Sequence, residues 1–162
     1  MDDAMNSSFK RRILNFVLGR AIPFNAPHHF KVEEIFTDGV RISLPYKRVN
    51  KNHLNGIHAC ALATLSEYAS GLTLMRILRS ADYRIIMKDL KMTYHYQAKE
   101  GVKVEMRVNE KAVSDLILKP LEKTDAVFFP MIAEVYDFSG NHISTGEINW
   151  QLKKWDKVKT KA

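Results

Sequence analysis

The stretch NHLNGIHACALATLSEYASGL, residues 52–72, carries the strongest structural signal in this 162-residue chain. Small side chains occupy most positions from Ala59 to Gly71, and the apolar pattern predicts one long helix over 58–78. A helix that is apolar on most sides is buried on most sides, and small side chains let strands approach it closely. Glu67 is the one acid in the stretch. Because an unpaired carboxylate in a core is costly, Glu67 must pair with a base, reach solvent at an edge, or line a pocket.

The segments around this helix have the patterns of antiparallel strands. Asp38-Gly39 separates two β-type runs and predicts a hairpin. VKVEMRV, residues 102–108, alternates strictly between apolar and charged side chains, as a half-exposed strand does. Strands are predicted at 30–37, 40–46, 83–99, 102–108, 126–138 and 143–155, and a short helix at 109–121. Because no β–α–β alternation occurs, we expect an α+β fold with one antiparallel sheet wrapped around the long helix.

The N-terminal segment, residues 1–28, predicts an amphipathic helix over 6–20 followed by a loop. Phe9, Ile13, Phe16 and Val17 recur at helical spacing, and the other face carries Arg11, Arg12 and Arg20. We expect this helix to pack on the surface of the main domain, residues 29–154. The alternative is contact with a membrane surface. Residues 155–162 form a basic tail, which we expect to be solvated.

The composition is that of an ordinary globular domain with an excess of positive charge. Hydrophobic residues make up 46% and charged residues 27%, enough for one core without disulfides. The single cysteine, Cys60, is typical of a reducing compartment, so we expect a cytoplasmic protein. No run is long and apolar enough for stable membrane insertion. The net charge of +7 favours anionic partners, but without a recognition motif we expect no nucleic acid. No His or Cys cluster has the spacing of a metal site.

Two residues mark the start of the long helix as a possible site. Gly56 permits a tight turn, and His58 lies at the first helical turn, where free backbone N–H groups favour a developing negative charge. His58 and Glu67 are separated by about 180° around the helix and about 13–14 Å along it. One chain therefore cannot bring both side chains to the same reacting atom. If they cooperate, a second copy must supply one of them, as in a site shared across the two-fold axis of a homodimer.

The spacing of Asn52, His58 and Glu67, in a small-residue helix before a run of antiparallel strands, resembles the hotdog-fold acyl-CoA thioesterases. The likeness covers roughly residues 30–153 and is greatest to the phenylacetate-pathway type, and within it to a family of uncharacterised thioesterases. It implies a curved sheet around one central helix and dimers whose sheets pair edge to edge. Glu67 would be the general base or nucleophile, supplied by the partner chain. Asn52 would orient the substrate or water, while His58 and the N–H groups near Ala59 would polarise the carbonyl oxygen.

This resemblance also sets the functional expectations. The chain would hydrolyse an acyl-CoA or a similar thioester, with coenzyme A as part of the substrate, no separate cofactor and no metal. It would act as a homodimer or a dimer of dimers. Gly56, Ala59 and Cys60 would contact the substrate, although Ala59 and Cys60 stand where the family often has two glycines. The alternative is a non-catalytic acyl- or lipid-binding protein with the same pocket, in which Glu67 is only structural.

Overall fold

The elements of the fold follow the predicted order. The computed structural model describes residues 1–78 and 82–158. Its strands are β1 (Lys31–Ile35), β2 (Gly39–Leu44), β3 (Tyr83–Tyr94), β4 (Val102–Arg107), β5 (Val127–Asp137) and β6 (His142–Lys154). Its α-helices are α1 (Asp2–Met5), α2 (Ser8–Ala21), α3 (Ala59–Leu78), α4 (Glu110–Val113) and α5 (Lys119–Leu121). Short 3-10 helices are η1 (Pro23–His28), η2 (Arg48–Asn50) and η4 (Trp155–Lys157), and η3 (Ser114–Leu118) is a π-helical turn. The long helix is confirmed as α3.

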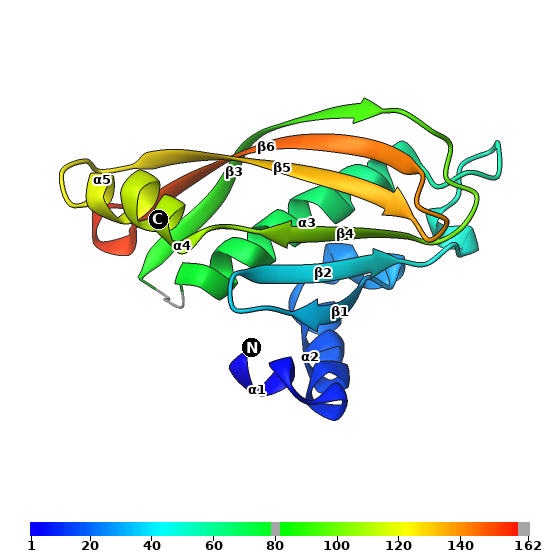
Figure 1. The fold of residues 1–162 in the computed structure, drawn as a ribbon, viewed down its shortest axis with the longest axis horizontal. Helices are drawn as coiled ribbons and strands as arrows, with labels where there is room; N and C mark the ends of the chain where they lie inside the picture. Colours follow the sequence, from blue (N-terminus) through cyan, green and yellow to red (C-terminus); the bar gives the residue numbers. More distant parts are fainter. Residues whose placement is uncertain (79–81, 159–162) are drawn as a thin grey trace.

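The six strands form one antiparallel sheet that curves around α3 (Figure 1). The strand order is β1-β2-β4-β5-β6-β3, so β1 and β3 are the two edges. The predicted hairpin at Asp38-Gly39 is confirmed, because it joins β1 to its neighbour β2. The strand predicted over 83–99 ends earlier, at Tyr94. This architecture is the expected hotdog fold, with the long helix held in the curve of the sheet.

Small side chains let the sheet approach α3 closely, as the sequence predicts. A Cβ placed at Gly146 of β6 would lie 2.9 Å from the Cβ of Ser66, closer than real side chains approach. A Cβ placed at Gly71 of α3 would lie 3.1 Å from the ring of Trp150. These two glycines therefore bring β6 against the helix and set Trp150 beside its middle turns.

The N-terminal helix packs on the domain, but through the side opposite to its apolar stripe. The side-chain amide of Asn15 donates to the Val32 carbonyl at 3.1 Å and accepts from the Val32 N–H at 2.7 Å. These bonds satisfy free backbone groups at the edge of β1 and turn Leu14 and Leu18 inward. The residues that the spacing groups on the apolar stripe are exposed: Phe9, Ile13, Phe16 and Val17. An apolar stripe normally faces the core, so the structure reverses the usual orientation.

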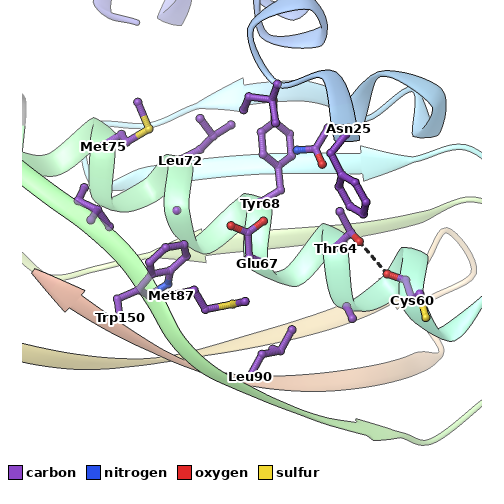
Figure 2. Close-up of a pocket in the computed structure, with 15 residues that line it drawn as sticks. Asn25, Cys60, Thr64, Glu67, Tyr68, Leu72, Met75, Met87, Leu90 and Trp150 are labelled. Atoms are coloured by element: carbon purple, nitrogen blue, oxygen red, sulfur yellow. Dashed lines mark hydrogen bonds between the residues drawn. The ribbon is translucent and has the colours of Figure 1, made fainter. Parts of the chain in front are cut away.

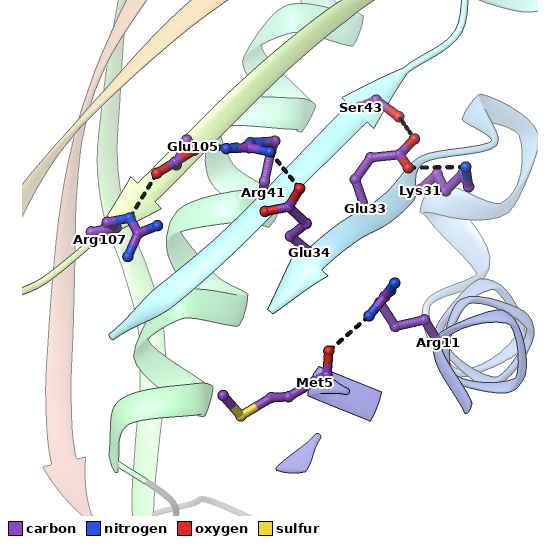
Figure 3. Close-up of polar contacts among 9 residues, drawn as sticks. All are labelled: Met5, Arg11, Lys31, Glu33, Glu34, Arg41, Ser43, Glu105 and Arg107. Atoms are coloured by element: carbon purple, nitrogen blue, oxygen red, sulfur yellow. Dashed lines mark hydrogen bonds and ion pairs between the residues drawn. The ribbon is translucent and has the colours of Figure 1, made fainter. Parts of the chain in front are cut away.

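Two further expectations for the N-terminal segment are corrected. Arg20 does not lie on the face opposite the apolar stripe, because its guanidinium lies 5.7 Å from the centroid of the Phe16 ring. Arg11 does lie on that opposite face, which turns inward, and its guanidinium donates to the carbonyls of Ala4 and Met5 at 3.2 and 2.8 Å (Figure 3). The loop expected after α2 is the 3-10 helix η1, which buries Asn25. On the solvent side of the sheet, Arg41 pairs with Glu34 and Glu105, which links β1, β2 and β4 (Figure 3).

Candidate active site

A cavity of about 620 Å³ opens between α3, η1 and β3 (Figure 2). One face of α3 supplies much of its wall, since lining residues recur every three or four positions from Cys60 to Met75. The remaining wall comes from η1, from β3 and from Trp150 on β6. Most of these side chains are apolar, which suits the hydrocarbon part of a ligand.

Glu67 lies midway along this face of α3, with its carboxylate directed into the cavity (Figure 2). The side chain is half-buried, and no donor or cation among the described residues contacts it. Burial raises the pKa of its carboxyl group. Burial and the nearby Glu67 raise the pKa of Tyr68 to about 12, so that phenol stays protonated at neutral pH. Of the three environments that the sequence allows for Glu67, the structure shows the pocket.

His58 caps the N-terminus of α3. Its Nδ1 accepts a hydrogen bond from the Cys60 N–H at 3.0 Å, and its carbonyl accepts from the N–H groups of Ala61 and Leu62. Because Nδ1 is an acceptor, the neutral ring carries its proton on Nε2 of an exposed side chain. The Ala59 N–H has no acceptor among the described residues and lies at the positive end of the helix. Two donors are thus available at this end of α3.

Asn52 holds the loop that precedes α3. Its side-chain oxygen accepts from the N–H groups of Leu54 and Gly56 at 2.9 and 3.0 Å. Its side-chain nitrogen has no hydrogen-bond partner within the described chain, so it can donate to a ligand. Gly56 is buried, and a Cβ there would lie 2.7 Å from the side chain of Gln97. Gly56 therefore shapes the loop, and its contact with substrate stays a prediction.

The predicted site residues do not converge within one chain. Cys60 and Glu67 line the 620 Å³ cavity, whereas Asn52 and Ala59 line a second cavity of about 320 Å³ beside the start of α3. His58 is in the wall of neither cavity. This separation agrees with helix geometry, which places His58 and Glu67 on opposite sides of the helix, about 180° apart.

Trp150 contributes to the cavity in a way that its sequence pattern did not reveal. Its Nε1 donates to the Ser70 hydroxyl at 3.0 Å, and that hydroxyl donates to the Glu67 carbonyl at 2.9 Å. Trp150 thereby fixes the helical turn that carries the candidate base. The alternation of β6 indicates that Trp150 points inward, but the helix residue opposite it depends on tertiary packing.

Replacing Trp150 by phenylalanine should lower the free energy of unfolding by about 1–3 kcal/mol, because a void forms and Ser70 loses its donor. Urea denaturation followed by circular dichroism measures this change. Trp155→Phe is the control, since Trp155 is 53% exposed and its replacement should cost less than about 0.5 kcal/mol. Equal losses in the two variants would contradict the role assigned to Trp150.

Comparisons with known proteins agree with this architecture. A family model described as a domain of unknown function, DUF4442, matches residues 10–152. No curated protein matches the chain. A solved protein of unknown function and probable thioesterase from Pseudomonas aeruginosa is 23% identical, with a TM-score of 0.80 over 88% of this chain and 95% of its own. A solved thioesterase from Haemophilus influenzae is 8% identical, with a TM-score of 0.67 over 93% of this chain and 94% of its own. At sequence identities this low, the similarity to these two proteins concerns the fold alone.

Proposed function

We propose that this chain, which belongs to the DUF4442 family, hydrolyses the thioester bond of an acyl-CoA. The observation that carries the proposal is the environment of Glu67. Within the described chain, this half-buried carboxylate has no partner and faces an apolar cavity. Such an arrangement destabilises an ionised group, and it is common where the group performs chemistry. The solved thioesterases of the same fold support the reaction class by analogy.

In the proposed mechanism, Glu67 acts as a general base. The acyl group lies in the apolar part of the cavity, and the carbonyl lies beside the carboxylate. Glu67 removes a proton from a water molecule, and the resulting hydroxide attacks the carbonyl carbon. The tetrahedral intermediate then breaks its C–S bond, and the proton passes from Glu67 to the leaving thiolate. A raised pKa suits this role, because it makes the carboxylate a stronger base toward the attacking water.

The charge that develops on the carbonyl oxygen requires hydrogen-bond donors. We propose that a second copy of the chain supplies them through His58 Nε2, the Ala59 N–H and the side-chain nitrogen of Asn52. The positive end of that copy's α3 would add to the stabilisation. Glu67 of each chain would thus work with the helix start of the other.

The open edge of β3 supports pairing with that second copy. β3 has 12 residues and pairs with β6 but with no other described strand. An open edge of this length can pair with the same edge of another chain about a two-fold axis. The strand also joins the two cavities, since Met87 and Leu90 line the first and Tyr94 lines the second. We therefore propose a homodimer formed at β3.

The proposed function is tested with short, medium, long and aromatic acyl-CoAs, and hydrolysis is measured by the release of free thiol. We expect turnover of the acyl groups that fit the cavity, and a dimer by light scattering. Binding of acyl-CoAs without turnover of any of them would favour the acyl-binding alternative. A clean monomer that turns over substrate would contradict the shared site.

A further inference from the structure

The outer face of α2 is an apolar surface that no described residue covers. We define it as Phe9, Ile13, Phe16 and Val17, whose exposed fractions are 70%, 49%, 66% and 51%. These positions share about 100° of the helix circumference, the width of a stripe that normally packs on a core. Phe24 of η1 is 71% exposed and adds a third aromatic ring near this helix. A surface of this kind usually marks an interaction site.

Basic side chains surround the outer face of α2. Lys10 and Arg12 lie on its two sides, and the Arg20 guanidinium lies 5.7 Å from the centroid of the Phe16 ring. The helix sequence SFKRRILNFVLGRA contains no acid. Lys10 contacts Asp3 at 3.3 Å, but this exposed pair is weak and leaves the ammonium accessible. The chemistry of the surface therefore fits a partner that is both apolar and anionic.

A second copy of the chain is a poor match for this chemistry. The chain carries a net charge of +7, so two outer faces brought together would place like charges side by side. The proposed dimer also uses another surface. α2 is hydrogen-bonded to the edge strand β1 through Asn15, whereas β3 is the opposite edge of the sheet (Figure 1).

We propose that the outer face of α2, together with Phe24, docks on an anionic lipid surface. The phenylalanine rings enter the boundary between headgroups and acyl chains, while Lys10, Arg12 and Arg20 bind lipid phosphates. The helix lies in the plane of this boundary; among the described residues, no helix has the length and hydrophobicity to cross a bilayer. Because Phe24 also lines the Glu67 cavity, docking brings the wall of that cavity to the lipid surface.

Vesicle sedimentation tests the docking independently of hydrolysis. Vesicles of phosphatidylcholine alone are compared with vesicles that also contain phosphatidylglycerol, at low and at raised salt. We expect the protein to sediment with the anionic vesicles only, and less so as salt screens the charges. Phe9→Ser/Phe16→Ser should weaken this binding roughly tenfold or more. Arg12→Glu/Arg20→Glu should abolish the preference for anionic lipid.

Two matched variants control for a general loss of apolar or basic side chains. Phe128→Ser/Ile132→Ser removes exposed apolar groups from β5, and Lys111→Glu/Lys123→Glu reverses exposed charges elsewhere. Both should bind anionic vesicles as the wild type does.

Three results would overturn the docking proposal. The first is a wild-type protein that does not bind phosphatidylglycerol vesicles, and the second is a Phe9→Ser/Phe16→Ser variant that binds them equally well. The third is a control variant that loses binding to the same extent. If Phe9→Ser/Phe16→Ser instead lowers the molecular mass by light scattering and leaves vesicle binding unchanged, the outer face is an interface between copies.

Discussion

Glu67→Gln should slow hydrolysis by between about a hundredfold and ten-thousandfold while making the folded protein more stable at neutral pH. Glutamine keeps the shape of the side chain but cannot accept a proton from water. Because the Glu67 carboxylate is half-buried without a cation beside it in the described chain, its ionised form destabilises the folded state. The neutral amide removes that penalty. Thioester hydrolysis rates and melting temperatures measure the two effects.

The gain in stability should depend on pH. Burial raises the pKa of Glu67 above its ordinary value of 4.5, so the folded state retains the proton to higher pH than the unfolded state. The stabilisation that comes from this retained proton is complete below pH 4.5 and is lost as the pH rises through the raised pKa. The glutamine variant does not titrate here. Its melting temperature should therefore equal that of the wild type in acid and exceed it at neutral pH.

Glu134→Gln is the matched control for this experiment. Glu134 is an exposed acid on β5, so its replacement should change neither the rate nor the melting temperature. If Glu67→Gln lowers the melting temperature at neutral pH, Glu67 stabilises the fold through its charge. The proposed base would then be wrong even if the variant is inactive.

The sequence predicted the central helix and the sheet because their signals are local. The small and apolar residues of 58–78 indicate a helix that is buried on most sides, and the alternation of 102–108 fixes which side chains of that strand face inward. The orientation of α2 could not be predicted in this way. Helical spacing groups Phe9 with Phe16 but does not say which face turns inward, and the bonds from Asn15 to β1 decide that.

Arg76, in the core, is another residue whose surroundings could not be predicted from the sequence. It lies in the last turn of α3 and is buried, yet its guanidinium pairs with Asp2 at 2.7 Å and donates to the Phe36 carbonyl at 3.0 Å. Both partners are distant in sequence, so the apolar pattern of the helix gives no indication of them. Trp150 is a similar case at the site, because its bond to Ser70 depends on the register of β6 against α3.

A heterodimer of two inactive variants should recover about half of the wild-type activity, since one of its two shared sites is intact. One chain carries Glu67→Gln, and the other carries His58→Asn. Asparagine is a preferred N-cap, so it can replace the capping acceptor of His58 while removing the Nε2–H donor. The two chains carry different affinity tags, are expressed together, and are purified through both tags before thiol release is measured.

The same heterodimer separates a shared site from two independent ones. If each chain used its own His58 and Glu67, both sites of the heterodimer would be defective, and activity would stay near that of the inactive homodimers. In the shared arrangement, Glu67 of the His58→Asn chain meets His58 of the Glu67→Gln chain, and that site has every proposed group. Recovery therefore requires a contribution from the second copy. If activity is not recovered in a stable heterodimer, the partner chain does not supply the His58 that acts with Glu67.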